Sequence, residues 1–404
     1  MNVALALASV GLLAVAAVGR AMRADDTASA SAHIAASPQF NGKKFDNGVP
    51  MNPDLTTARG VLSMLTEWVT SGAQREPATT PPVDRLTSGD FARPVTDGIK
   101  VWWLGHSTLL IEIDGVRILT DPVWSERASM FSWAGPKRYF APLIALEDLP
   151  DIDAVLISHD HYDHLDKATI KRLAQISDTP FFVPLGVGAH LRGWGIADDR
   201  VTELDWWEET TVGGVTLAAT PARHMSGRGL FDQNATLWAS WALVGPKHRV
   251  YFGGDSGLTE AFEQIGDRYG PFDLTMLDTG QYGKWWPDVH MGPEQAVIAQ
   301  KALRGKLLLP IHWGLFTLAT HSWTEPAERM RVAAREGGIA IVQPRPGQPV
   351  ALSSPLQNPE DYATPWWPTD VDWQDADTRK IQSTHVDPAW IERMRARRTP
   401  RTAP

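Results

Sequence analysis

Short β-rich runs recur through the middle of the chain, and each is followed by a polar loop. They read VRILTDP, DAVLISHDH, VTLAATPARH, RVYFGGDSG and KLLLPIHWG. Apolar runs of this kind between turn signals are typical of strands buried in a sheet. Helical patterns lie between some of them, at residues 167–175, 258–265 and 293–302. Strands mixed with helices in this way predict an α+β sandwich of sheets and helices over residues 98–350.

The segments on either side of this core have different patterns. Residues 25–97 are rich in small and polar residues and are typical of a linker and N-terminal extension. Within them, an amphipathic stretch at residues 58–69 predicts one short helix. Residues 351–404 are rich in proline and tryptophan and end in a basic run. We expect this last segment to be a C-terminal extension and not a second domain.

The first 24 residues hold a long apolar stretch. Residues 3–19 are interrupted only by Ser9, and Arg20 and Arg23 follow. The stretch is slightly shorter than the roughly 20 residues that span a bilayer, so it predicts either a membrane anchor or a cleaved signal segment. As an anchor, it would keep the rest of the chain in the cytoplasm by the positive-inside rule, whereas cleavage would export the chain. Both alternatives place the protein near a membrane during its biogenesis.

Composition narrows the classes of partner and cofactor. The 404 residues carry a net charge of −9. Because binding to a nucleic-acid backbone needs a basic face, nucleic acid is not an expected partner. The chain has no cysteine, which excludes disulfides, iron–sulfur clusters and thiolate zinc sites. Any transition metal would therefore be bound by nitrogen and oxygen atoms.

Histidine and aspartate residues collect where the predicted strands end. The stretch LISHDHYDHLD, residues 156–166, holds three histidines and three aspartates directly behind an apolar run. Loops at one edge of a sheet often carry reactive groups, because the strands hold them in place. We therefore expect these side chains to converge with those that follow four other strands, namely Asp121, His224, Asp255 and His312.

The spacing within LISHDHYDHLD predicts two separate binding points. Side chains alternate along an extended backbone, so His159 and His161 should point to the same side. A turn through Tyr162 can then direct Asp163 and His164 to a second point nearby. Imidazole and carboxylate groups are good zinc ligands, and two ions about 3.5–4 Å apart can share one hydroxide. We expect Asp255 to bridge them.

Each of these residues also has an ordinary structural interpretation. A histidine cluster after a strand can be a solvated loop, and single aspartates commonly start turns or cap helices. The shared position at strand ends favours metal binding for the whole set. For Asp121, in TDP, we favour a role in orienting a ligand histidine through its ring N–H over a role in a turn. No role is assigned to the remaining core histidines, which are His106, His190, His248 and His321.

At these motifs the chain resembles the metallo-β-lactamase-fold hydrolases. The HDHYDH signature together with Asp255 and His312 marks that superfamily. More narrowly, the chain resembles the branch of N-acyl-phosphatidylethanolamine-hydrolysing phospholipase D and its bacterial relatives. The narrower resemblance rests on blocks between about Trp102 and Glu325, which read WWLGHST, LTDPVWSERAS, GPKR, LPDIDAVLISHDHYDHLD, FVPLG, ELDWWEE, IGDRYGPFDL, HMGPEQAV and PIHWGLFTLA.

The resemblance implies a four-layer αββα sandwich with two zinc ions at one edge. Three histidines hold one ion, an aspartate and two histidines hold the other, and one aspartate bridges the two. The three histidines of the first ion are His159, His161 and His224. The second ion is held by Asp163, His164 and His312, and the bridging aspartate is Asp255. The resemblance also implies that His290, in HMGPEQAV, contacts the substrate phosphate or the leaving group. Iron and manganese accept the same ligands, so the identity of the metal stays open.

The implied reaction is the hydrolysis of a glycerophospholipid at a membrane surface. A hydroxide that bridges the metals attacks phosphorus, and the products are phosphatidic acid and, for an N-acylated lipid, an N-acylethanolamine. Asp255, Asp163 and His290 are the expected catalytic residues, and the resemblance implies a homodimer. The alternatives are a hydrolase of the same fold that acts on a lactone, a β-lactam or another phosphodiester, and a membrane-anchored metal-binding protein without catalytic activity.

One loop departs from the pattern of the family. The segment LDTGQYGKWWPD matches it only loosely and adds the carboxylate Asp278. In this loop Tyr282, Trp285 and Trp286 are candidates for lining a groove for an acyl chain, although such aromatics more often belong to a core. The sequence therefore predicts the substrate less firmly than it predicts the metal centre.

Overall fold

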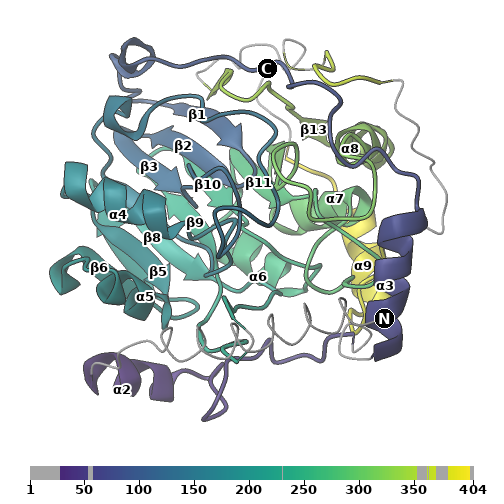
Figure 1. Cartoon of the computed structure of the whole chain (residues 1–404), viewed down its shortest axis with the longest axis horizontal. Helices are drawn as coiled ribbons and strands as arrows, with labels where there is room; N and C mark the ends of the chain where they lie inside the picture. Colours follow the sequence, from purple (N-terminus) through teal and green to yellow (C-terminus); the bar gives the residue numbers. More distant parts are fainter. Residues whose placement is uncertain are drawn as a thin grey trace, which may run out of the picture.

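The computed structural model describes residues 28–52, 58–229, 231–352, 362, 364–369 and 381–400. Within them, two seven-stranded sheets lie face to face, and helices cover their outer faces (Figure 1). The predicted α+β sandwich of four layers is confirmed. The apolar stretch at residues 3–19 lies outside the described residues. Among the helices of the described part, none has both the length and the apolar character needed to cross a membrane.

The strands of each sheet follow an order that places the ends of the chemically important strands at one edge. The first sheet runs, in spatial order, through β14 (Pro349–Leu352), β1 (Ile99–Gly105), β2 (Thr108–Ile113), β3 (Val116–Thr120), β4 (Ala154–Leu156), β5 (Phe181–Pro184) and β6 (Val201–Leu204). The second runs through β13 (Ala340–Ile341), β12 (Leu307–Ile311), β11 (Leu274–Asp278), β10 (Arg249–Phe252), β9 (Ser240–Val244), β8 (Val215–Thr220) and β7 (Glu209–Val212).

Strand direction explains why polar groups meet at this edge. In the first sheet β1 and β3 are both antiparallel to β2, and β3 is parallel to β4, so these three strands point the same way. In the second sheet β8 and β10 are both antiparallel to β9, and β10, β11 and β12 are parallel. The residues that follow β1, β3 and β4 and those that follow β8, β10, β11 and β12 therefore leave each sheet at the same edge.

Alternating side chains build the layers on both sides of each sheet. In β4, Ala154 and Leu156 face the core between the sheets, while Val155 faces the layer beneath the helices. This is the alternation expected of a strand that is buried on both faces. The space between the sheets is filled by large apolar residues from both of them, including Trp103 and Trp241.

The helices fall into two groups and an N-terminal pair. The first sheet is covered by α4 (Lys167–Ile176) and α5 (Val187–Gly193), and the second by α6 (Ala261–Arg268), α7 (Pro293–Ala302), α8 (Glu325–Gly337) and α9 (Pro388–Ala396). The N-terminal pair is α2 (Ala28–Ala36) and α3 (Ala58–Thr70), and short 3-10 helices are η2 (Ser88–Phe91), η3 (Leu146–Asp148) and η4 (Asp198–Arg200). The C-terminal α9 packs on the helical layer, where Trp390 Nε1 donates to Glu263 Oε2 at 2.9 Å.

One predicted helix begins later than the sequence pattern indicates. The stretch predicted from residue 258 becomes helical only at Ala261. The reason is that the preceding residues are tied to the loop after β8: Gly257 N–H donates to the Arg223 carbonyl at 2.9 Å, and the Arg223 guanidinium donates to the Leu258 carbonyl at 3.4 Å. The helices predicted at residues 58–69, 167–175 and 293–302 correspond to α3, α4 and α7.

Candidate metal centre

The structure brings all seven predicted ligands together at the shared sheet edge. His159, His161 and His224 offer ligand atoms that lie within 4.8 Å of one another, and so do Asp163, His164 and His312. A third group, made of His159, His164 and Asp255, joins the first two. One group of three nitrogen donors and one mixed group thus lie on either side of a single carboxylate.

Asp255 occupies the position of a bridge between the groups. Its Oδ2 lies 3.1 Å from His164 Nε2 and 3.7 Å from His224 Nε2, and its Oδ1 lies 3.0 Å from His312 Nδ1. Burial alone would raise the pKa of Asp255, but the neighbouring imidazoles of His164 and His312 hold that pKa well below its usual range. The group is therefore an ionised carboxylate that faces ligands from both sides.

Three imidazole nitrogens converge in the first group. His161 Nδ1 lies 2.8 Å from His159 Nε2 and 3.3 Å from His224 Nε2. The opposite nitrogen of His224, Nδ1, lies 2.9 Å from the Val289 carbonyl oxygen, which makes it the donor and leaves Nε2 as the lone-pair atom. Burial, the largest cause, and the other imidazoles lower the pKa of His159 and His224 well below the usual range. Neutral imidazole is the form that binds metals.

The donor set fits two divalent metal ions. It consists only of imidazole nitrogen and carboxylate oxygen, and the nitrogens of His159 and His224 lie 2.8 and 3.3 Å from the same nitrogen of His161. These are the donors that zinc, iron and manganese accept in proteins. Five of the seven residues are buried, whereas His161 and Asp163 are partly exposed and mark the open side of the centre.

Comparisons with known proteins agree with this geometry. Residues 116–313 match the beta-lactamase superfamily domain. Over 345 residues the chain is 46% identical to an uncharacterized protein of Mycobacterium tuberculosis, an alignment that spans 85% of this chain and 90% of that protein. Over 314 residues it is 38% identical to the N-acyl-phosphatidylethanolamine-hydrolyzing phospholipase D 1 of Caenorhabditis elegans, which spans 73% of this chain and 88% of that relative.

The chain belongs to the metallo-β-lactamase superfamily. Among solved structures, it is similar to Igni18, a metallo hydrolase of the archaeon Ignicoccus hospitalis, with a TM-score of 0.50 and 24% identity over 64% of this chain and 99% of that chain. Likeness at this level of identity shows the shared fold alone. Together, the family and the ligand groups identify a metal-dependent hydrolase of the metallo-β-lactamase fold.

In this superfamily member, Asp121 lies beside His164, one of the predicted ligands. The buried Asp121 Oδ2 lies 2.7 Å from His164 Nδ1. The Ser158 amide and hydroxyl donate to the same carboxylate at 2.7 and 2.6 Å, which fixes its orientation. Since Asp121 takes Nδ1, the Nε2 atom of His164 is directed at Asp255 and Asp163.

His106, to which no role was assigned from the sequence, contacts the candidate metal centre. The side chain of His106 is fully buried, its Nε2 lies 2.8 Å from Asp163 Oδ2, and its ring lies 4.0 Å from that of His312. Its carbonyl also accepts the backbone N–H of His312 at 3.0 Å. A signal was available, because His106 directly follows β1, a strand that ends at the same edge as β3 and β4.

His290 lies at the centre, paired with Asp278. Its Nδ1 is 2.7 Å from Asp278 Oδ2 and 3.9 Å from Asp255 Oδ2. Burial, with the nearby Asp255 adding to it, raises the pKa of Asp278 to about 6. Burial would lower the pKa of His290, but the Asp278 carboxylate raises it above the usual value.

Gly280 allows the ends of β11 and β12 to approach each other closely. No side chain fits at this position, because a Cβ there would collide with the His312 carbonyl.

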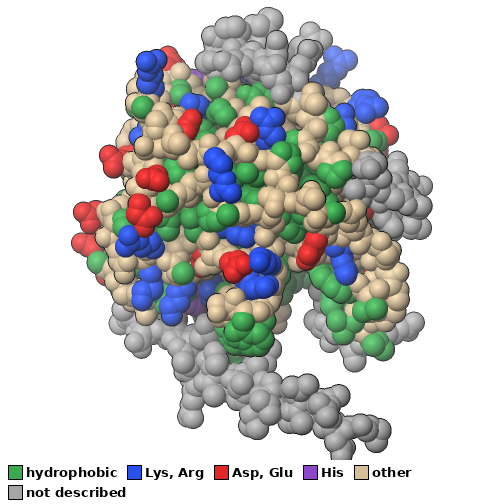
Figure 2. All heavy atoms as spheres, turned by 45° about the horizontal axis from the view of Figure 1, so that its top comes forward, with side chains coloured by type: hydrophobic (Ala, Val, Ile, Leu, Met, Phe, Trp, Pro, Cys, Tyr) green, Lys and Arg blue, Asp and Glu red, His purple; other side chains and the backbone are tan. Residues whose placement is uncertain are grey.

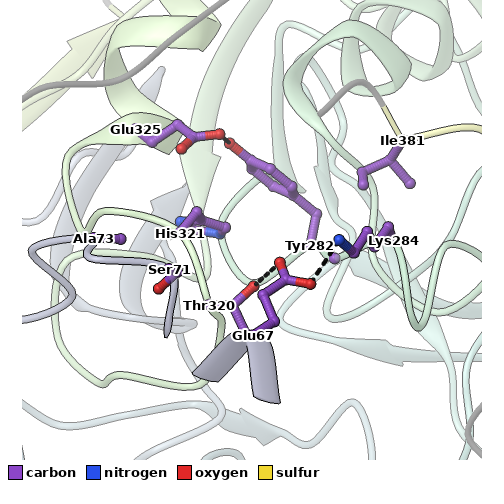
Figure 3. A pocket seen from close by; sticks show the side chains of 10 residues that line it. Glu67, Ser71, Ala73, Tyr282, Lys284, Thr320, His321, Glu325 and Ile381 are labelled. Atoms are coloured by element: carbon purple, nitrogen blue, oxygen red, sulfur yellow. Dashed lines mark hydrogen bonds and ion pairs between the residues drawn. The ribbon is translucent and has the colours of Figure 1, made fainter. Parts of the chain in front are cut away.

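Three aromatic candidates lie in the loop that leads to His290, namely Tyr282, Trp285 and Trp286. The polar atom of each side chain donates a hydrogen bond within the protein. Tyr282 lines a cavity of about 290 Å³, and its hydroxyl donates to Glu325 Oε1 at 3.0 Å. Figure 3 shows this contact. Trp285 Nε1 donates to Glu67 Oε2 of α3 at 2.8 Å, and Trp286 Nε1 donates to the Gln281 carbonyl at 2.7 Å. The cavity is lined by charged as well as apolar side chains, and contact of these aromatics with an acyl chain stays a prediction.

Proposed function

We propose that this protein is a zinc-dependent phosphodiesterase that hydrolyses glycerophospholipids of the N-acyl-phosphatidylethanolamine type, with phosphatidic acid and N-acylethanolamine as products. The observation that carries the proposal is the set of seven candidate ligands, in which six residues surround Asp255. The choice of substrate is supported by the 38% identity to a relative named as a phospholipase D for this lipid, of which the alignment spans 88%.

The chemistry divides between the metals and the chain. Two divalent ions, when bound, supply a hydroxide nucleophile and neutralise charge on the phosphate. The chain's own contribution is to hold Asp255 ionised between the two ligand groups and to keep Asp163 beside His106 at the open side. His290, in the same opening, is placed to give a proton to the departing alkoxide.

A membrane surface is part of the proposal, because the substrate is a lipid. On α3, Leu62, Leu65 and Val69 recur at helical spacing and are 66%, 52% and 83% exposed. A helix that presents an apolar face in this way suits the interface of a bilayer. Figure 2 shows hydrophobic side chains on projections along the lower edge of the molecule. The N-terminal segment, as an anchor or a cleaved signal, would keep the enzyme close to this surface or export it across the membrane.

Product analysis with a panel of substrates tests the proposal. Full-length protein in detergent, loaded with zinc, is incubated with N-acylated and ordinary phospholipids, bis(p-nitrophenyl) phosphate, lactones and a β-lactam, and products are identified by mass. We expect release of phosphatidic acid and N-acylethanolamine, and two zinc ions per chain by metal analysis. Asp255→Asn should lower kcat by at least about 10³-fold, since it removes the charged carboxylate that would hold both ions.

Two results would refute the proposed function. Turnover of a lactone or a β-lactam without cleavage of any phosphodiester would assign the chain to another reaction of the superfamily. Near-normal turnover by Asp255→Asn, with its metal content verified, would show that the carboxylate does not bridge the ions. An exposed carboxylate away from the centre, Asp198, offers the matched control, and Asp198→Asn should keep full activity.

A further inference from the structure

Asp278 is a buried carboxylate that the family resemblance does not account for. It is the last residue of β11, where its backbone pairs with Ile311 of β12, and its side chain is fully buried. Its Oδ1 accepts the Gly280 N–H at 3.1 Å, and its Oδ2 lies 2.7 Å from His290 Nδ1. The strand therefore fixes the carboxylate, and the carboxylate has one imidazole as its side-chain partner among the described residues.

This contact determines which nitrogen of His290 faces the opening. Nδ1 is held by Asp278, while the ring stacks 5.1 Å from His312 and meets His224 edge-on at 5.1 Å. Packing on two sides opposes rotation of the ring. Nε2, on the far side of the ring, has no hydrogen-bond partner within the described part of the chain, and 15% of the side chain remains exposed. Nε2 is thus the atom of His290 that a substrate in the opening meets.

We propose that Asp278 is a positioning residue that anchors His290 through Nδ1 and so presents Nε2 to the leaving oxygen of the substrate. The inference rests on the proposed phosphodiesterase function and deepens it. Water oxygen forms the new bond to phosphorus, the bond from phosphorus to the head-group oxygen breaks, and that oxygen takes the proton of His290 Nε2. The proton lost by water passes to solvent, from which Nε2 is protonated again. A carboxylate that orients an imidazole for proton transfer is a recurrent catalytic arrangement.

Substrates with different leaving groups distinguish the positioning role of Asp278 from a purely structural one. An alkoxide needs a proton as it departs, whereas p-nitrophenolate leaves without one. Asp278→Ala should lower kcat for N-acyl-phosphatidylethanolamine about 10²-fold and for bis(p-nitrophenyl) phosphate less than about threefold. Asp278→Asn, which keeps the volume and an oxygen that can accept from Nδ1, should lose less. His290→Gln should give the same contrast as Asp278→Ala, and the double variant should be no worse than His290→Gln alone.

Matched controls exclude damage to the fold or to the metal centre. Thr279→Val changes the adjacent residue, whose buried hydroxyl has no hydrogen-bond partner within the described residues, and should leave both activities unchanged. Metal analysis should find equal metal content in all variants. Equal losses of activity on both substrates would overturn the proposal. Loss of a metal ion from Asp278→Ala would also overturn it, because Asp278 lies close enough to Asp255, His290 and His312 to be a metal ligand itself.

A measurement without substrate keeps this inference separate from the proposed function. In full-length protein labelled with 15N-histidine, the signals of His290 are identified by their loss in His290→Gln. The wild type and Thr279→Val should show a hydrogen-bonded proton on Nδ1, and Asp278→Ala should lose this signature. An unchanged Nδ1 signal in Asp278→Ala would refute the anchoring. If the wild type cleaves no phosphodiester, the proposed function fails, and the NMR result still decides whether Asp278 positions His290.

Discussion

His106, which is not among the predicted ligands, contacts two residues of the mixed group. Through its side chain it contacts Asp163, and through its carbonyl it holds the backbone of His312, so one residue positions two ligands of the mixed group. Its backbone adopts a left-handed conformation (φ 57°), which is uncommon for a residue with a side chain. Strain of this kind persists where surrounding contacts determine the conformation.

His106→Ala should therefore weaken the binding of one metal ion. We expect about 10–100-fold lower affinity at the Asp163, His164 and His312 group, because the orienting partner of a ligand carboxylate is lost. Competition with a chelator, followed by metal analysis, measures this as one ion released at lower chelator concentration than the other. His33→Ala, which breaks an exposed histidine–glutamate pair with Glu208 away from the centre, is the control. Equal affinity of both ions in His106→Ala would contradict the prediction.

At the scale of elements, polar contacts link α3 to the loop that leads to His290. Glu67 on α3 contacts Lys284 Nζ at 2.7 Å and accepts from Trp285 Nε1 at 2.8 Å and Thr320 Oγ1 at 3.1 Å. Burial tends to raise the pKa of Glu67, but these partners lower it below its usual value. One carboxylate thus joins the helix with the exposed apolar face to the loop that leads to His290, and Figure 3 shows its contacts with Lys284 and Thr320.

Glu67→Ala should loosen α3 without unfolding the sandwich. Hydrogen bonds to a charged group contribute about 1.5–3 kcal/mol, so amide hydrogen exchange in residues 60–70 should accelerate by roughly tenfold or more. Hydrogen exchange with mass spectrometry compares the variant with Thr66→Ala, which removes only a hydroxyl bonded within the same helix. Unchanged protection of α3 in Glu67→Ala would show that apolar packing alone holds the helix in place.

At the scale of the whole molecule, the metal centre joins the two sheets. Four of its residues follow β4 in the first sheet, and the other three follow β8, β10 and β12 in the second. Ions bound there would therefore link the two halves of the sandwich. A ligand that binds only the folded state stabilises it in proportion to the logarithm of its concentration relative to Kd.

Removal of the metals should accordingly lower the thermal stability of the whole domain. At about 1,000 times Kd the stabilisation is roughly 4 kcal/mol, which for a domain of this size corresponds to a decrease in Tm on the order of 10 °C after chelation. Calorimetry of loaded, chelated and zinc-restored protein measures the change. Asp255→Asn should respond less to chelation. A Tm that stays constant while metal analysis shows complete removal would mean that the ions do not connect the sheets.

Local patterns in the chain predicted the strands that carry the candidate ligands, the helices α3, α4, α6 and α7, and a sandwich of sheets and helices, because periodicity and turn residues are encoded over short stretches, whereas the four-layer arrangement was implied by the family resemblance. They also identified the residues of HDHYDH together with His224, Asp255 and His312, since all of these follow strands. Contacts such as His106 with Asp163, 57 residues apart, depend on strand order and direction, which no local pattern encodes. Folding alone decided that Asp278 meets His290 and that Glu67 meets Trp285, because each pair comes together only when separate elements pack.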